Sequence, residues 1–226
     1  MKYERISEAV FLRRPNRFIA HVDLHGEEVI CHVKNTGRCR ELLIPGTRVI
    51  VQRAANPQRK TKYDLTAVYK GSRLINIDSY APNIVFNEFL RGSGLGFQPD
   101  IVRPECTHGD SRFDFYTEYG DKKAFIEVKG VTLESDDIVS FPDAPTLRGL
   151  KHVRGLMHCL EEGYEAYIVF IVQMKGVKFF EPNRETQSEF ADALIEAEKA
   201  GVHILAFDCD VAPDSLIVSD SVEIRL

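Results

Sequence analysis

The chain has 226 residues, of which 44% are hydrophobic and 28% are charged, and its formal net charge is −5. This balance is typical of a water-soluble globular protein, and the length allows one large domain or two small ones. The start, MKYERISEAVFLRRPNRF, has no apolar secretion segment, and no later run approaches the roughly 18 apolar residues of a membrane span. We therefore expect a cytoplasmic protein with no membrane association.

Positive charge is concentrated in the first third of the chain. Residues 1–80 contain fifteen Lys and Arg against eight Asp and Glu, a net charge of +7, whereas residues 81–226 contain fourteen against twenty-six, a net charge of −12. A basic segment joined to an acidic remainder suggests that the first third meets a polyanion. A basic surface that is merely solvated would explain the charge equally well.

Short strand-like runs separated by turn residues fill most of residues 1–80. Five or so such strands predict a small barrel, and barrels of the OB type are common platforms for nucleic acids. We therefore assign residues 1–80 to a basic, OB-like β-barrel domain. The expected strands are FIAHVDL (18–24), EEVICHV (27–33), TRVIVQRA (47–54), DLTAVYK (64–70) and RLINID (73–78).

The basic residues of this domain are candidate DNA contacts. The segment NTGRCREL (35–42) opens with turn-forming residues, whose backbone N–H groups can meet a phosphate. Phe11 and Phe18 offer stacking faces near the first strand, although phenylalanines are more often core residues. The alternative is a barrel loop capped by Thr36 with solvated arginines. The candidate contacts are Arg13, Arg14, Arg17, Lys34, Asn35, Thr36, Gly37, Arg38 and Arg40.

Helix and strand patterns alternate in residues 81–226, which predicts a mixed-sheet α/β (or α+β) domain. Two of the helices carry sequence signals at their ends. PNIVFNEFLRG (82–92) has Pro82 near its start and Gly92 after its end. In the predicted helix at 143–163, Asp143 is the expected N-terminal cap and Gly163 is expected to end the helix. The remaining elements are strands at 101–106, 112–119, 122–129, 164–172 and 202–208, and a third helix at 186–201; the core stripe of the second helix is Leu147, Leu150, Val153, Met157 and Leu160.

The stretch RFDFYTEYGDKKAFIEVKG (112–130) predicts a hairpin closed by Gly120 and Asp121. In that register Asp114 faces Glu127, and Lys129 lies two residues further along the same face. Two carboxylates placed together repel each other unless a cation lies between them. Mg²⁺ or Mn²⁺ suits such a place, because these hard cations take carboxylates and keep several waters.

This arrangement is the equipment of metal-assisted phosphodiester hydrolysis, with Asp114, Glu127 and Lys129 as the catalytic residues. The metal ligands would be the two carboxylates, the carbonyl of Val128 and a third acid, either Glu105 or Glu88. The alternative is a solvent-facing hairpin whose acids are neutralised by ordinary ion pairs with Arg112 and Lys129.

The helix that follows the hairpin offers a second basic face. Arg148, Lys151 and His152 lie off its expected core stripe at spacings of three and four residues, so they can direct a phosphate-binding face towards the metal. An ordinary solvated helix face is the alternative. Gln173, at the end of the 164–172 strand, is a further residue that could line the site.

Four strings together resemble the sugar fermentation stimulation protein A family, and they span most of the chain. They are HVKNTGRCRELLIPG (32–46), SRFDF (111–115), EVKGVTL (127–133) and FPDAPTLRGLKH (141–152).

This resemblance implies an OB-like barrel followed by a domain similar to the PD-(D/E)-x-K nucleases. It also implies DNA binding without marked sequence preference and a regulatory link to sugar utilisation. The nuclease pattern matches Asp114, Glu127 and Lys129, but Phe113 stands where the pattern has proline.

Three functions therefore remain open at this stage. The chain could be a non-catalytic DNA-binding regulator, a metal-dependent endonuclease of the PD-(D/E)-x-K type, or an RNA-processing protein, because OB barrels do not by themselves distinguish the two polymers. The sequence leaves the natural substrate and the oligomeric state open, with a homodimer as one option.

Overall fold

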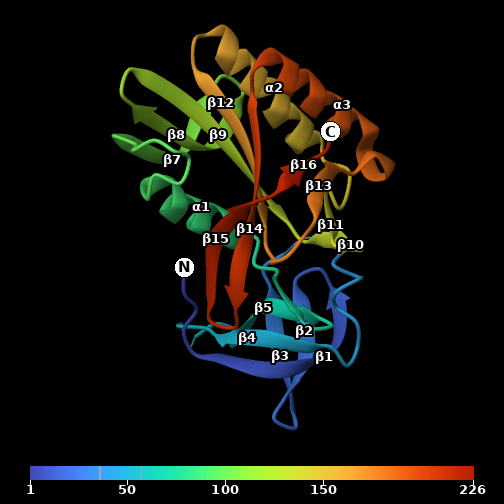
Figure 1. Ribbon diagram of the computed structural model, residues 1–226. Helices are drawn as coiled ribbons and strands as arrows, with labels where there is room; N and C mark the ends of the chain where they lie inside the picture. The colour runs from blue at the N-terminus through green and yellow to red at the C-terminus, as the bar shows by residue number, and fades with distance from the viewer. Residues whose placement is uncertain (36, 57) are drawn as a thin grey trace.

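The computed structural model describes residues 1–35, 37–56 and 58–226, and Figure 1 shows a barrel packed beneath a larger α/β part. Among these residues, none of the helices combines the length and the apolar composition needed to cross a bilayer.

The first part is an OB-like barrel, as the sequence predicts. Its strands follow the order β3-β2-β1-β4-β5-β6, and a parallel pairing between β3 and β5 closes it. Phe11, Val22, Cys31, Val49 and Leu65 fill its interior. The strands are β1 (Ile6–Asn16), β2 (Ile19–Leu24), β3 (Glu27–Val33), β4 (Arg48–Arg53), β5 (Tyr63–Lys70) and β6 (Arg73–Asn76).

The long strand β1 is the element of the barrel that the sequence analysis missed. Its second half carries Arg13, Arg14 and Pro15, residues that resemble a loop. The strand nevertheless pairs with β2 on one side and β4 on the other, and bulges after Phe11 and after Arg13 bend it around the barrel.

The second part is a six-stranded mixed sheet in the order β15-β14-β12-β9-β8-β7. Helix α1 (Ala81–Arg91) packs on one face, whereas α2 (Leu147–Glu161) and α3 (Arg184–Ala200) cover the other. The helix-and-strand order of this part agrees with the sequence prediction. The strands are β7 (Ile101–His108), β8 (Ser111–Tyr119), β9 (Lys122–Val131), β12 (Glu165–Val172), β14 (His203–Ala212) and β15 (Ser215–Ser221).

A small second sheet was not predicted, because each of its strands has only two to four residues. It consists of β10 (Leu133–Ser135), β11 (Ile138–Phe141), β13 (Phe179–Pro182) and β16 (Glu223–Ile224).

The start of α2 differs from the prediction. Thr146, and not Asp143, is the cap, and its Oγ1 accepts a hydrogen bond from the Gly149 N–H at 2.9 Å. The reason is Pro145, which disfavours the helical conformation for the residue before it, so the helix begins only after the proline. Leu147, predicted to be in the core stripe, is 82% exposed.

The β8–β9 hairpin has the register that the sequence predicts. Gly120 and Asp121 form the turn, and the ladder runs from Tyr119 opposite Lys122 to Phe115 opposite Ile126. The left-handed backbone of Gly120, with φ of 57°, suits this tight turn. Beyond that point β8 and β9 part, while β9 continues to pair with β12.

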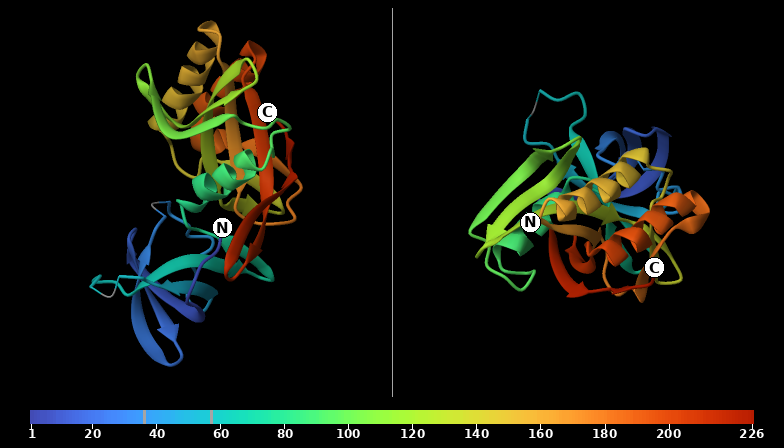
Figure 2. Two further views of the ribbon diagram at one scale, coloured as in Figure 1. Left: turned by 90° about the vertical axis from the view of Figure 1, so that its left-hand side faces the viewer. Right: turned by 90° about the horizontal axis from the view of Figure 1, so that it is seen from above.

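The two parts are joined by buried hydrogen bonds around Gln173. Its side-chain Nε2 donates to the Oδ1 of Asn76 at 2.9 Å and to the carbonyl of Asp78 at 3.1 Å. Its own carbonyl accepts from the Asn76 N–H at 2.9 Å. Figure 2 shows the β14–β15 hairpin extending to the barrel, where Val211 packs against the cluster of Ile50, Ala67 and Leu74. Both contacts hold the barrel against the second part, as do the ion pairs of Lys70 with Glu134 and of Arg73 with Asp137.

Substituting Gln173→Leu should lower the free energy of unfolding by about 1–3 kcal/mol, because the buried carbonyl of Asp78 loses its donor. Urea denaturation followed by circular dichroism measures the effect. The matched control is Gln98→Leu at an exposed position, where a change within about 0.5 kcal/mol is expected. Equal effects of the two substitutions would contradict the role assigned to Gln173.

Candidate functional site

The candidate site lies where β8 and β9 part. Asp114 leaves the ladder here, and its Oδ2 accepts a hydrogen bond from the Val128 N–H at 2.8 Å. Its Oδ1 accepts from the Asn83 side-chain amide at 2.7 Å. Helix α1 and the open edge of β9 therefore fix the Asp114 carboxylate between them.

Glu127 is the buried acid of the site, with 2% of its surface exposed. Its Oε1 contacts Lys129 Nζ at 2.5 Å and also His152 Nδ1. Its Oε2 is buried and has no hydrogen-bond partner in the part of the chain that the structure describes. One oxygen of this carboxylate is thus paired with two side chains, and the other has no hydrogen bond.

The two acids influence each other. Burial, and next the charge of Glu127, raise the pKa of Asp114 above its usual value, although Val128 and Asn83 donate hydrogen bonds to it. Burial also acts to raise the pKa of Glu127, but His152 and Lys129 outweigh it and hold that pKa below the usual value. Glu127 is therefore the firmly ionised partner, and Asp114 carries the cost of the second negative charge.

The residues present fit a hard divalent cation. One positive ion would bind the unpaired Oε2 of Glu127 and would also stabilise the ionised form of Asp114, whose pKa is raised. The N–H and C=O of one strand residue point to the same side, so the carbonyl of Val128 faces Asp114 as its N–H does. Two carboxylates, one carbonyl and waters make a ligand set typical of Mg²⁺.

A third acidic ligand is not part of this set. Glu105 lies at a β7 residue with φ of 56°, and its side chain is exposed and paired with Arg112. Glu88 pairs with the N-terminal amine at 2.7 Å. Across the described ranges, no group of three or more His, Cys, Asp and Glu residues is arranged to hold a metal. Any remaining ligands would therefore be waters or substrate oxygens.

The sequence analysis expected His152 on an outer face of its helix. In the structure its side chain is buried, at 4% exposed, and contacts Glu127. Arg148 Nε lies 3.5 Å from His152 Nε2 and can only donate, so Nε2 accepts and Nδ1 donates to Glu127. Arg148 and Lys151 remain exposed on α2. The helix therefore contributes one buried anchor for Glu127 and two cations at the surface.

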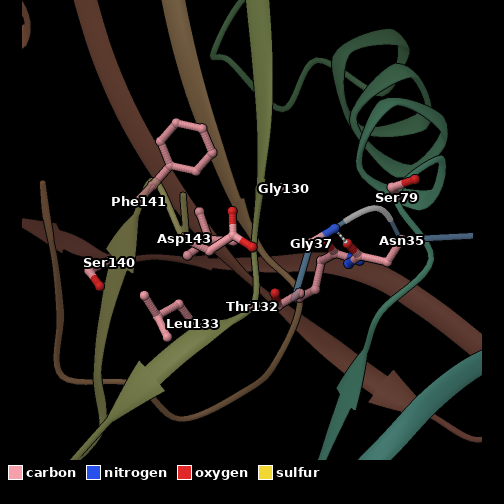
Figure 3. Close-up of a pocket in the computed structure, with 11 residues that line it drawn as sticks. Asn35, Gly37, Ser79, Gly130, Thr132, Leu133, Ser140, Phe141 and Asp143 are labelled. Carbon is pink, nitrogen blue, oxygen red and sulfur yellow. Dashed lines mark hydrogen bonds between the residues drawn. The ribbon is translucent and has the colours of Figure 1, made fainter. Parts of the chain in front are cut away.

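A polar cavity of about 170 Å³ lies between the barrel and the sheet, next to the site. Figure 3 shows Asn35 and Gly37 of the barrel facing Asp143 and Thr132 of the second part. Gly130, which directly follows Lys129, lines this cavity together with Gln173. A Cβ on Gly130 would lie 2.7 Å from Pro82 Cγ, so glycine permits the close approach of α1 and β9.

The basic residues of the barrel border an open groove of about 650 Å³. Arg17, Arg38 and Arg40 are exposed there, and none has an acidic partner among the described residues. Gly37 lines both this groove and the polar cavity. Groove and cavity are therefore neighbours that meet at one loop.

The other predicted contacts of the barrel are already engaged. The Arg14 guanidinium donates to the carbonyls of Arg17, Asn35, Gly37 and Arg38 at 2.7–3.0 Å, so it holds the loop in shape. Thr36 lies outside the described residues.

Two further basic residues are tied to acids. Arg13 pairs with Glu28 at 2.5 Å, and Lys34 pairs with Asp78 at 3.1 Å. We therefore regard Arg17, Arg38 and Arg40 as the freest cations of the predicted set in this domain.

Asn83 is the residue of the site that the sequence analysis missed. A single asparagine on an amphipathic helix carries no motif, and its role appears only when the fold brings α1 beside Asp114. Its position in the first turn of α1 was the one available signal.

Comparisons with known proteins cover the whole chain. A family model described as the SfsA N-terminal OB domain matches residues 12–77, and one described as the sugar fermentation stimulation protein RE domain matches residues 80–215. A sugar fermentation stimulation protein homolog of Desulfitobacterium hafniense is 56% identical over 226 residues, covering 100% of this chain and 99% of the relative. A homolog of Clostridium beijerinckii is 53% identical, with both chains covered completely.

A solved structure has the same fold. The structure of Pyrococcus furiosus SfsA in complex with Ca²⁺ has a TM-score of 0.89 and 28% sequence identity, covering 100% of this chain and 98% of that one.

Asp114→Asn should make the free energy of unfolding fall less steeply between pH 4 and pH 7 than in the wild type when divalent cations are removed, because the variant has no carboxylate at this position. The pKa of Asp114 is raised by folding, so its favourable contribution is complete below its unfolded pKa of about 4 and is lost as the pH rises. The difference in stability between variant and wild type should therefore move in favour of the variant as the pH rises from 4 to 7. Urea denaturation with chelator at both pH values measures this shift, with exposed Asp121→Asn as the control; a difference that is the same at pH 4 and pH 7 would contradict the assignment.

Proposed function

The chain belongs to the sugar fermentation stimulation protein family, and we propose that it binds DNA without marked sequence preference and holds a divalent cation between Asp114 and Glu127. The observation that carries the proposal is the unsatisfied, buried Oε2 of Glu127 beside a second carboxylate whose pKa is raised. Two neighbouring carboxylates share one lysine, so a negative charge of the pair stays uncompensated; burying it is costly, and a cation at this position would offset the cost.

The charge distribution supports binding to DNA. Residues 1–80 carry a net charge of +7, and Arg17, Arg38 and Arg40 border one groove without acidic partners among the described residues. Phosphate contacts of this kind position a protein on DNA but do not read the sequence. Weak sequence preference is the consequence that we expect.

The relative from Pyrococcus furiosus supports the choice of a hard cation, because its structure is described as a complex with Ca²⁺. Ca²⁺ and Mg²⁺ both prefer oxygen ligands such as carboxylates and carbonyls. We propose Mg²⁺ or Mn²⁺ for this chain, because the described side chains offer only two carboxylates and leave the other positions to water.

Phosphodiester hydrolysis is the second candidate function, and Lys129 favours it. A bound divalent cation would supply a polarised water and neutralise charge on a phosphate. Lys129 Nζ lies 2.5 Å from Glu127 and remains 14% exposed, so it can donate to a phosphate oxygen or orient a water at the edge of β9. His152 keeps the Glu127 carboxylate in place.

A regulator that does not cut DNA is the alternative to hydrolysis, and the name shared by the relatives suggests a role in sugar utilisation. Such a protein would keep the barrel groove and use the acids structurally. Its affinity for DNA would not change on addition of a chelator. RNA is a further candidate partner, and competition between DNA and RNA oligonucleotides of one sequence tests it.

The double substitution Arg38→Gln, Arg40→Gln should weaken DNA binding and reduce the slope of log affinity against log salt by about 2, because two phosphate contacts are lost. Fluorescence anisotropy over a salt series measures the slope. Arg184→Gln is the matched control, since Arg184 lies on α3 and already pairs with Asp192 at 2.8 Å. An unchanged slope in the double variant would exclude these arginines from the contact.

Mn²⁺ at a hundred times its dissociation constant should raise the melting temperature by roughly 5–10 °C, and Asp114→Ala should abolish this rise. Glu105→Gln is the control, because this exposed acid on β7 lies outside the ligand set. A rise that persists in Asp114→Ala would place the ion elsewhere. Nicking of supercoiled plasmid with Mg²⁺, lost in Asp114→Ala and kept in Glu105→Gln, separates hydrolysis from binding alone.

A further inference from the structure

Two aromatic rings are unusually exposed close to the junction of the two parts. Phe18, at the start of β2, is 45% exposed, and Tyr80, directly before α1, is 67% exposed. By contrast, Phe11 of the same barrel is 1% exposed. Aromatic side chains contribute most when their surface is covered, so a pair of open rings is a candidate contact for flat ligand groups.

The backbone connects the two positions. The Val33 N–H donates to the carbonyl of Phe18 at 2.8 Å, and the next residue, Lys34, accepts a hydrogen bond from the Ser79 hydroxyl. With 3.8 Å between consecutive Cα atoms and about 5 Å between paired strands, the backbones of Phe18 and Ser79 lie within about 15 Å of each other. The two positions are therefore close enough for one nucleic-acid strand to reach both.

Tyr80 also lies next to the acids. Asn83 and Asn87 follow Tyr80, the N-cap of α1, by three and seven residues, so all three lie along one side of this helix and its cap. Asn83 is the residue whose amide holds Asp114 at 2.7 Å. Ser79, the neighbour of Tyr80 in sequence, lines the polar cavity that begins at Gly130. A flat ligand group stacked on Tyr80 would thus lie about one helical turn from Asn83, which holds Asp114.

Positive charge accompanies the rings. The Arg17 guanidinium lies 4.9 Å from the centre of the Phe18 ring, and it borders the groove that also contains Arg38 and Arg40. Exposed rings interleaved with arginines are the combination that binds single-stranded nucleic acids, because bases stack on the rings while cations follow the phosphates.

From these observations we infer that the DNA taken by this protein is single-stranded, with Phe18 and Tyr80 each stacking on a base along a path from the arginine groove to Asp114 and Glu127. This inference rests on the proposed DNA-binding function and specifies its substrate. A duplex offers phosphates to the same arginines, but its bases are stacked on each other and their faces are closed to the rings.

The test compares the affinity of the full chain for an oligothymidylate of about 16 nucleotides, the upper site size of one OB fold, with its affinity for a duplex of equal length. Both are measured by fluorescence anisotropy at one salt concentration with chelator present. We expect the single strand to bind at least about tenfold more tightly. Tyr80→Ala and Phe18→Ala should each weaken single-strand binding by about 5- to 100-fold and duplex binding by less than about twofold.

Two controls sharpen the comparison. Tyr80→Phe keeps a ring and should retain the affinity, and Ile217→Ala removes an apolar side chain that is 56% exposed on β15 and should change nothing. The ring substitutions should leave the salt slope unaltered, because they remove no phosphate contact.

The inference is overturned if the two alanine variants weaken single strand and duplex equally, or weaken neither, while the wild type binds DNA. If the wild type shows no salt-dependent binding to either form, the proposed function itself fails, and the inference fails with it. These two results are distinct, so the experiment separates the substrate form from DNA binding as such.

Discussion

The central constraint in this structure is a buried carboxylate, that of Glu127, with a hydrogen bond to only one of its two oxygens among the described residues. Glu127 lies on β9 just beyond the last paired residues of the β8–β9 ladder, so no residue of β8 is paired opposite it. Lys129 and His152 satisfy one oxygen and leave the other bare. A fold that maintains such a charge accepts a cost that a hydrophobic residue would avoid, which is common where side chains serve a function.

The other features of the molecule surround this carboxylate. Helix α1 directs Asn83 at Asp114, and Gly130 lets that helix approach β9 closely. Helix α2 inserts His152 beneath Glu127. The barrel meets the same edge through the loop that Arg14 holds in shape by bonding four carbonyls. Acids, cavity and basic groove are therefore neighbours: Gly130, next to Lys129, lines the cavity, and Gly37 lines both the cavity and the groove.

Local patterns in the sequence predicted the parts of this region that depend on short-range geometry. The hairpin register follows from the two-residue turn and from alternation, so counting predicts the ladder as far as Phe115 opposite Ile126, one pair before Asp114 and Glu127. His152 could not be placed in the same way, because its burial depends on the rotation of α2 about its axis, which packing sets. The helix buries His152, Leu156 and Cys159, and not the predicted Leu147, Met157 and Leu160. The short strands of the second sheet depend on long-range pairing and leave almost no local pattern.

The strong negative charge of residues 81–226 also has a place in this arrangement. A net charge of −12 repels DNA from most of the second part, and ions screen that repulsion only beyond about 8–10 Å. Contact with phosphates is then favoured at the barrel groove and at the exposed cations of α2, Arg148 and Lys151. A divalent cation between Asp114 and Glu127 would reverse the sign of the potential at one more point, the end of the path that the arginines define. Binding of the metal and binding of the strand are therefore expected to strengthen each other, since each supplies the charge that the other needs.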